Sequence, residues 1–195
     1  IVEQQASGNV GARHVLGRSA QEIEAFVAEV GLPIVVKPPD GAGCKGTFRI
    51  DDHAALARSL AELAPSPAAP VLAEEFLRGA EGSCEMVVLG GRVHAHSISH
   101  YMPGPLEAMC TEWIQWVCLF PRNIDDPAHR AIRRLGEHTV AALGLEDGLA
   151  HMEWYRRDDG SLAIGEIAAR PPGGQLTSMT GLVHDADIYR TWARA

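Results

Sequence analysis

Residues 151–170 read HMEWYRRDDGSLAIGEIAAR, with two short apolar runs on either side of Asp159-Gly160. An Asp-Gly pair between such runs is a strong short-range signal for a hairpin with a tight two-residue turn. A turn at these two residues sets Glu153 directly opposite Glu166. Facing side chains in an antiparallel pair have Cβ atoms about 4.5–5.5 Å apart, a separation at which like charges repel. The hairpin therefore predicts an antiparallel sheet with an unfavourable pair of carboxylates on one face.

Helix signals occur in three other stretches, each with a capping residue ahead of apolar residues at helical spacing. We expect these helices to follow Ser19, Asp52 and Asp126 and to end near Gly31, Pro65 and Gly144. A short helix is expected near residues 186–194. Strands are expected in the opening stretch and over residues 33–38, 47–50 and 71–76, with a second hairpin over 83–100. Helices mixed with antiparallel hairpins predict an α+β fold and not a series of βαβ units.

The length of 195 residues is enough for one large domain or two small ones with cores of their own. We expect a small subdomain near residues 10–75 and a larger sheet over residues 76–195. The first residues, IVEQQASGNV, have neither an initiator Met nor the basic and apolar regions of a signal peptide. We therefore expect the chain to be part of a longer protein.

Charge and composition argue against several classes of partner. The net charge is −8 and no basic stripe is visible, which argues against a nucleic acid held by phosphate contacts. No apolar run approaches the roughly 18–20 residues that span a bilayer, so we expect no membrane partner. The four cysteines lack the spacing of a metal site or a disulfide framework, which favours a reducing, cytoplasmic location. A homodimer is compatible with the sequence.

The stretch KPPDGAGCKG at residues 37–46 has the composition of a phosphate-binding loop. Gly41, Gly43 and Gly46 permit backbone conformations that bring N–H groups close to a ligand. Lys37 and Lys45 add positive charges that attract phosphate oxygens. The alternative reading is an ordinary glycine-rich hairpin loop with solvated lysines. The Walker pattern is excluded because no Ser or Thr directly follows Lys45.

Three ordered stretches resemble the core of the ATP-grasp superfamily. They are GLPIVVKPPDGAGCKGTFRI at 31–50, VLAEEFLRGAEGSCEMVVLGGRV at 71–93 and GLEDGLAHMEWYRRDDGSLAIGEIAARPPGG at 144–174. Each stretch is weak alone, but the ordered trio is specific, and the resemblance covers the chain from Ser19 to about Asp187.

The resemblance implies an α+β ATP-grasp fold, in which two α+β subdomains with mostly antiparallel sheets enclose the nucleotide. Residues 10–75 would be the lid subdomain, with its glycine-rich loop at 39–46. Residues 76–195 would be the core subdomain with the metal site. The N-terminal domain that usually precedes this core would be absent.

The resemblance also implies ATP as the cofactor and assigns the residues that bind it. Lys37 would contact the phosphates, the 41–46 loop would close over them, and Glu81 would bind the ribose hydroxyls. The segment 74–77 would form the hinge between the subdomains and read the adenine edge with backbone groups. The nucleotide-binding set is Lys37, Gly41, Gly43, Lys45, Gly46, Glu74, Glu75, Phe76, Leu77 and Glu81.

The same resemblance accounts for the facing carboxylates. Glu153 and Glu166 would hold Mg²⁺, with Mn²⁺ as an alternative ion, between the ATP phosphates. Magnesium prefers oxygen ligands and is usually held by one or two carboxylates plus substrate phosphates. Arg170 would face the reacting phosphoryl and carboxylate oxygens, which makes Arg170, Glu166 and Lys37 the catalytic set. The alternative is that Arg170 merely neutralises the glutamates.

The implied activity is that of an ATP-dependent ligase. Such an enzyme transfers the γ-phosphate of ATP to a substrate carboxylate, and an amine or other nucleophile then displaces phosphate from the acyl phosphate. The Gly173-Gly174 backbone would shape the acceptor pocket for these small-molecule substrates. This chemistry relies on positioning and charge neutralisation, which fits a site of lysine, arginine, glutamates and magnesium.

Two alternatives to this ligase stay open. One is a bicarbonate-activating enzyme similar to biotin carboxylase or the carbamoyl phosphate synthetase large subunit. The other is an ATP-binding module without catalysis. The second alternative is favoured by one departure from the family pattern: the residue two places after the second glutamate is usually Asn, a further metal ligand, and here it is Ala168. Water could replace that ligand, His151 could fill the space, or the metal could bind more weakly.

Several other polar and aromatic residues are expected to have ordinary structural roles. Glu85 is expected on the surface of a strand, and Trp113 and Trp116 in the core or in a pocket wall. The histidines of HAHSISH, at residues 94–100, extend too far along one strand for all of them to ligate one ion.

Overall fold

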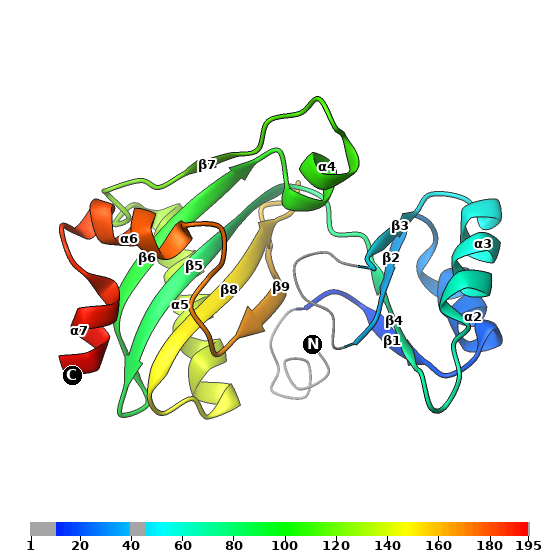
Figure 1. Ribbon diagram of the computed structural model, residues 1–195, viewed down its shortest axis with the longest axis horizontal. Coiled ribbons are helices and arrows are strands. Elements are labelled where there is room, and N and C mark those ends of the chain that lie inside the picture. Colours follow the sequence, from blue (N-terminus) through cyan, green and yellow to red (C-terminus); the bar gives the residue numbers. More distant parts are fainter. Residues whose placement is uncertain (1–10, 40–45, 195) are drawn as a thin grey trace. The chain divides into compact units, whose positions relative to one another are not determined.

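The computed structural model describes residues 11–39 and 46–194, and Figure 1 labels its elements. The chain divides into two compact units, Ala12–Leu77 and a second unit that runs from Arg78 onward and includes Gly11. Each unit has one antiparallel sheet and a hydrophobic core of its own, so the predicted mixed α+β fold is confirmed. None of the helices in these described ranges has the length and hydrophobicity that crossing a membrane requires.

The unit Ala12–Leu77 is a four-stranded sheet, with the strand order β1-β4-β2-β3, and two helices. Its elements are β1 (His14–Gly17), α2 (Ala20–Val30), β2 (Ile34–Lys37), β3 (Phe48–Ile50), α3 (His53–Leu63) and β4 (Val71–Glu75). The side chains of Ser19 and Asp52 cap α2 and α3, as predicted, because each accepts a hydrogen bond from a backbone N–H in the first helical turn.

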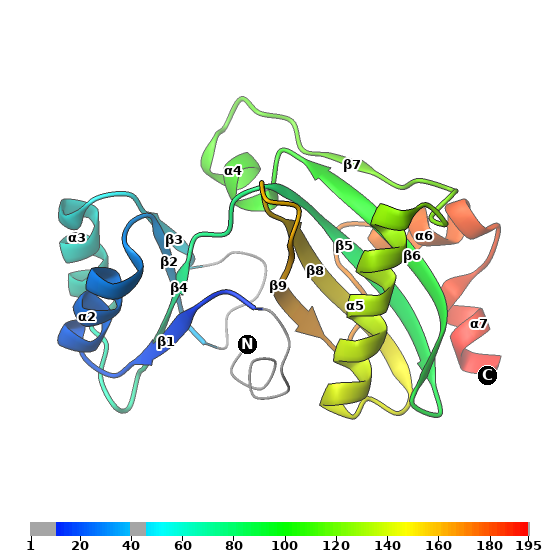
Figure 2. The same cartoon turned by 180° about the vertical axis from the view of Figure 1, so that it is seen from behind.

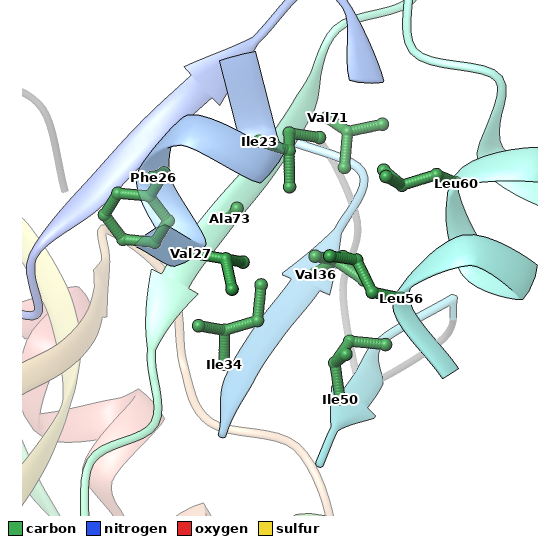
Figure 3. Packing of buried hydrophobic residues seen from close by; sticks show 10 residues of the cluster. All are labelled: Ile23, Phe26, Val27, Ile34, Val36, Ile50, Leu56, Leu60, Val71 and Ala73. Atoms are coloured by element: carbon green, nitrogen blue, oxygen red, sulfur yellow. The ribbon is translucent and has the colours of Figure 1, made fainter. Parts of the chain in front are cut away.

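The core of this unit lies between its two helices and one face of its sheet. Figure 3 shows Val27 of α2 and Leu56 of α3 packed near Ile34 and Val36 of β2. Successive side chains of a strand point to opposite faces. Alternation therefore places Lys37, the residue after Val36, on the face of the sheet away from the helices.

The second unit is a five-stranded sheet with the strand order β7-β6-β5-β8-β9. Its elements are β5 (Ala80–Leu89), β6 (Arg92–Met102), α4 (Pro105–Cys110), β7 (Val117–Leu119), α5 (Pro127–Leu143), β8 (Gly148–Arg156), β9 (Leu162–Ala168), α6 (Leu176–His184) and α7 (Ile188–Arg194). Figures 1 and 2 show α5 on one side of this sheet and α6 on the other. The core lies on the α5 side, where Ile132 and Val140 of the helix meet Met152 and Trp154 of β8.

The long helix α5 begins and ends where the sequence predicts. The Asp126 side chain accepts hydrogen bonds from the N–H groups of Ala128 and His129, and Pro127 occupies the first turn. Gly144 ends the helix in the left-handed conformation that glycine adopts without strain.

The hairpin β8–β9 confirms the predicted pairing of Glu153 with Glu166, but its turn differs from the prediction. The N–H of Arg157 donates to the Ser161 carbonyl at 2.9 Å, so the loop has three residues, 158–160, and not two. Gly160 takes a φ of +83°, the left-handed position that a three-residue loop requires. The prediction of a two-residue turn was wrong because an Asp-Gly pair fits both kinds of loop.

A bulge in β9 restores the register that the longer loop would have shifted. Trp154 pairs with Ile164 and Glu153 pairs with Glu166, which leaves Gly165 as the extra residue. A Cβ at Gly165 would lie 2.7 Å from the Tyr155 ring, so a larger residue there would require that ring to move. The loop and the bulge each displace the pairing by one residue, and the two displacements cancel at the carboxylates.

Candidate active site

The candidate site is the face of the five-stranded sheet opposite α5. In β8 the core residues Met152 and Trp154 alternate with His151 and Glu153, which therefore point to the other side. Cross-strand pairing extends this face into rows across β6, β5, β8 and β9. We call the members of three such rows the polar face: Tyr101, Glu81 and Tyr155; Ser99, Ser83, Glu153 and Glu166; and Ser97, Glu85, His151 and Ala168.

A buried hydrogen-bond network occupies the centre of the polar face. The Ser83 hydroxyl lies 2.6 Å from Ser99 Oγ and donates to Glu85 Oε1 at 2.6 Å. Nδ1 of His151 lies 3.0 Å from both oxygens of Glu85 and donates to them. All four of these residues are buried. A carboxylate buried this deeply is tolerated because it is hydrogen-bonded and paired with a cation.

The surroundings of His151 favour its charged form. Burial lowers the pKa of His151, but the neighbouring carboxylates of Glu153 and Glu85 outweigh burial and raise this pKa to about 9. Nε2 of the ring lies 3.7 Å from Glu153 Oε1. His151 is therefore a cation at neutral pH that lies between two carboxylates. Since an imidazolium carries a hydrogen on each nitrogen, this form has no lone pair for a metal ion.

Glu153 and Glu166 lie at the more open part of the polar face. Their side chains are 30% and 43% exposed. Arg170 follows β9, and its Nη2 lies 3.8 Å from Glu166 Oε1. Two hard oxygen donors set side by side and partly open to solvent suit Mg²⁺, which is usually held by one or two carboxylates. Within residues 11–39 and 46–194 no group of three or more His, Cys, Asp or Glu is arranged to hold a metal ion. Further ligands would have to be substrate oxygens or water.

Glu81 occupies the row of the polar face beside Glu153. Burial raises the pKa of Glu81 to about 7, a hydrogen bond with Tyr155 partly offsets this, and the charge of Glu153 adds to the rise. The carboxylate lies against Gly104, where an added Cβ would be only 2.1 Å from Glu81 Oε2. Glu81 is thus a carboxyl group that changes charge close to neutral pH.

In the other unit, Lys37 and Glu74 form an ion pair on the face of the four-stranded sheet away from the helices. Lys37 Nζ lies 2.5 Å from Glu74 Oε2, and the two side chains are 25% and 7% exposed. The second oxygen, Glu74 Oε1, is buried and makes no hydrogen bond to any described residue. A buried acceptor without a partner is uncommon and requires an explanation.

The segment 74–77 ends β4 and leads into the second unit. The Glu75 N–H donates to the Arg13 carbonyl at 2.9 Å, and the Phe76 N–H donates to the Pro33 carbonyl at 3.3 Å. The guanidinium of Arg49 lies 4.4 Å from the centre of the Phe76 ring, a cation–π contact that fixes this aromatic side chain. These two N–H groups are therefore already used inside the unit.

The predicted phosphate loop lies largely outside the described residues. Gly41, Gly43 and Lys45 lie outside the described residues. Gly46 is described and takes a φ of +71°, in the left-handed region that favours glycine. The structure thus places Glu81, Glu153, Glu166 and Arg170 in one unit, and Lys37, Glu74, Glu75, Phe76 and Leu77 in the other.

The expectation for Glu85 was wrong, and the expectation that Trp113 lies in the core or in a pocket wall was wrong for the core. Glu85 is 7% exposed and not a surface residue, because it pairs with His151, 66 positions away in the sequence. No local pattern could reveal this contact; only the pairing of β5 with β8 does. Trp113 is 82% exposed and therefore not in the core. Trp116 contacts Tyr101 edge-to-face, with ring centroids 5.2 Å apart.

Comparison with known proteins identifies the family. A model of the ATP-grasp domain matches residues 5–182. The chain belongs to the ATP-grasp family. This family uses ATP, so the Lys37–Glu74 pair and the polar face belong to a nucleotide-dependent fold.

Two curated relatives of this ATP-grasp chain are ligases. The L-arginine-specific L-amino acid ligase of Bacillus subtilis is 32% identical over 165 residues, which cover 82% of this chain and 39% of the relative. The D-alanine–D-alanine ligase of Sodalis glossinidius (strain morsitans) is 26% identical over 160 residues, which cover 80% and 43%. The chain therefore spans about two fifths of the length of these relatives.

Solved structures share the fold of this ATP-grasp chain. An L-amino acid ligase from Bacillus licheniformis matches with a TM-score of 0.67 and 24% identity, over 94% of this chain and 41% of that one. A carboxyaminoimidazole ribonucleotide synthase from Aspergillus clavatus, complexed with ATP, matches with a TM-score of 0.69 and 20% identity, over 88% and 44%.

Proposed function

We propose that the protein containing this chain is an ATP-dependent ligase that joins amino acids. ATP would phosphorylate the carboxylate of one substrate, and the amine of a second would displace phosphate from the acyl phosphate. The relatives named as amino acid ligases support this substrate class. The single observation that carries the proposal is the facing pair Glu153 and Glu166. The pair lies beside Arg170, at the more open part of the polar face.

We assign nucleotide binding to residues of both units. The buried oxygen Glu74 Oε1 accepts no hydrogen bond from a described residue, so it could accept one from an amino group such as that of adenine. Because the N–H groups of Glu75 and Phe76 are already used, the backbone of Leu77 is our candidate for the remaining contact to the base. Lys37 would bind the phosphates, and Glu81 in its charged form would accept hydrogen bonds from the ribose hydroxyls.

Gly46 and the rest of the loop, with Gly41, Gly43 and Lys45, would close over the phosphates. The unit that carries this loop, near residues 10–75, would then be the lid, and the unit from about residue 76 onward would carry the metal. A lid of this kind excludes water from a reactive acyl phosphate.

Glu153 and Glu166 would hold Mg²⁺, and Mn²⁺ could replace it. The donor set fits this ion, because both ligands are carboxylates and their exposure leaves room for phosphate oxygens. Such an ion would neutralise charge on the transferring phosphoryl group. Ala168 offers no ligand, so water would complete the coordination there.

Arg170 would bind oxygens of the transferring phosphoryl group and of the substrate carboxylate. Its ion pair with Glu166 is long, and both side chains are 43% exposed. The guanidinium can therefore move to a ligand without leaving Glu166 as a buried, unpaired carboxylate. A Cβ at Gly174 would lie 3.7 Å from the Trp116 ring. We propose that Gly173 and Gly174, together with Trp116, shape the pocket of the acceptor.

An assay of the intact protein tests this function. Amino acids would be supplied singly and in pairs with ATP and Mg²⁺, and ADP release and dipeptide would be measured. Hydroxylamine would trap the acyl phosphate as a hydroxamate. ADP release that depends on an amino acid pair is the expected result. Release with bicarbonate alone would favour the carboxylase alternative, and ATP binding without turnover would favour a binding module.

A further inference from the structure

His151 lies between two carboxylates that belong to different rows of the polar face. Its Nδ1 faces Glu85, its cross-strand neighbour on β5, and its Nε2 faces Glu153, two residues along its own strand. On its other side His151 pairs with Ala168, whose methyl group offers no ligand to a metal ion. His151 is therefore the polar side chain nearest to Ala168 in that row.

The orientation of the His151 ring is fixed from the far side. The Ser83 hydroxyl donates to Glu85 Oε1 at 2.6 Å and is itself held by Ser99, whose Oγ lies 2.6 Å from Ser83 Oγ. Glu85 then contacts Nδ1 with both of its oxygens at 3.0 Å. This arrangement sets the plane of the imidazole, and with it the direction of Nε2, without any contribution from a ligand.

A purely structural role explains only half of these contacts. Buried Glu85 requires a cationic partner, and Nδ1 alone supplies it. The contact of Nε2 with the half-exposed Glu153 does nothing for Glu85. It places the imidazole edge 3.7 Å from one oxygen of Glu153, and it limits where that carboxylate can move.

We propose that Glu85 and His151 are positioning residues that hold the Glu153 carboxylate in place for the divalent cation. This inference rests on the proposed function. It assigns to His151 the role of orienting the metal ligand Glu153, next to Ala168, which supplies no ligand of its own. Partners of this kind, one step removed from a metal, typically change its affinity by about 10–100-fold when they are lost.

Two amide substitutions separate positioning from structure. The side-chain amide of Asn lies where the imidazole has Nδ1, and that of Gln reaches the place of Nε2. His151→Asn therefore keeps a partner for Glu85 and loses the contact with Glu153, whereas His151→Gln keeps the contact with Glu153. Both variants would be made in the intact protein. The dissociation constant of Mn²⁺ would be measured by EPR at saturating ADP, and the thermal midpoint by calorimetry.

If His151 positions Glu153, the variant that binds Mn²⁺ more weakly should be the one with the higher thermal midpoint. We expect His151→Asn to weaken Mn²⁺ binding about tenfold or more while keeping most of the thermal stability. His151→Gln should restore most of the Mn²⁺ affinity at a lower thermal midpoint. A matched control is His100→Gln, a histidine of β6 on the opposite, α5-facing side that lies 2.8 Å from His129 Nε2. This control should leave Mn²⁺ binding unchanged.

Three results would overturn the inference. One is unchanged Mn²⁺ affinity in folded His151→Asn, and another is equal loss in both His151 variants. The third is an EPR modulation from directly coordinated imidazole nitrogen in the wild type, which would make His151 itself a ligand. Failure of the proposed metal site looks different, because the wild-type protein would then not bind Mn²⁺ with ADP at all. Failure of the ligase activity alone, with Mn²⁺ binding retained in the wild type, would leave the positioning inference intact.

Discussion

The two faces of the five-stranded sheet are built from the same strands and are both largely buried, yet their chemistry is opposite. Under α5, Met152 and Trp154 are 0% and 1% exposed. On the polar face, Glu85 and His151 are 7% and 5% exposed. Burying apolar groups stabilises a fold, whereas burying a charge costs free energy even when it is paired. The comparison teaches that burial alone does not identify a core: the face with buried charges is the one for which we propose a ligand.

The four-stranded sheet repeats this division on a smaller scale. Its helix-covered face carries Val36 and Ala73, both 0% exposed. Its other face carries the Lys37–Glu74 pair with the unpartnered oxygen of Glu74. If the division is functional, substitutions on the covered faces should change stability, and substitutions on the polar faces should change ligand binding and turnover.

The largest effect is expected from the covered face of the five-stranded sheet. Trp154→Ala leaves a cavity between β8 and α5, so we expect the free energy of unfolding to fall by about 3–5 kcal/mol. Urea denaturation measures this loss. Trp154→Phe is the matched control, with a smaller loss because it fills part of the space. Loss of less than about 1 kcal/mol in the Ala variant would contradict the assignment of this face as the core.

Glu166→Gln on the polar face should affect turnover strongly and stability little. The substitution keeps the volume and removes one of two facing negative charges, so stability should be unchanged or slightly higher. Turnover should fall on the order of 100-fold, because a weakened cation neutralises less phosphoryl charge. Glu146→Gln, an exposed residue before β8, is the control. Full activity with an unchanged Mg²⁺ requirement would remove Glu166 as a ligand.

The local elements of this fold could be predicted from the sequence because their signals are local. Ser19, Asp52 and Asp126 cap the helices that they were expected to start. Helix α6 was missed because it lacks such a signal: Gln175 precedes it at a φ of +68° and makes no capping hydrogen bond through its side chain. The exact turn of the β8–β9 hairpin was also missed, since an Asp-Gly pair fits a two-residue and a three-residue loop alike.

The candidate site could be predicted only in part, for the same reason. The pairing of Glu153 with Glu166 follows from a hairpin, whose partners are close in sequence. The pairing of Glu85 with His151 depends on two strands that are separated in the chain by β6, α4, β7 and α5. Long-range contacts of this kind decide which polar residues are buried, and a single sequence contains no direct signal for them.

Lys37→Ala extends the comparison to the four-stranded sheet. A lost charge-assisted hydrogen bond to phosphate is worth about 1.5–3 kcal/mol, so we expect ATP to bind about tenfold or more weakly. The variant also leaves Glu74 without its cation, which should lower the thermal midpoint. Isothermal titration with ATP measures the affinity.

The combination Lys37→Met with Glu74→Gln separates the two effects of this substitution. It removes both charges and should recover stability without recovering ATP affinity, whereas Lys37→Arg should retain much of the affinity. Unchanged ATP binding in Lys37→Ala would end the phosphate assignment.

The smallest effect concerns Glu81, a half-buried carboxyl group of the polar face with no ion-pair partner among the described residues. Burial raises its pKa from an ordinary 4.5 to about 7. The folded protein therefore holds this proton more tightly than the unfolded chain, and the associated stability is lost as the pH rises from about 4.5 through 7. Glu81→Gln removes this pH dependence, so the variant should gain stability relative to the wild type between these values.

Thermal midpoints measured from pH 4 to pH 8 test this expectation for Glu81→Gln. The two profiles should nearly meet at pH 4 and diverge above pH 5, and each kcal/mol gained should raise the midpoint by about 2–4 °C. Tyr155→Phe sharpens the test, because it removes a hydrogen bond that lowers the pKa of Glu81 and should extend the divergence to higher pH and enlarge it. Parallel profiles would mean that the pKa of Glu81 is the same in the folded and the unfolded protein, and the polar face would then accommodate the ionised carboxylate without cost.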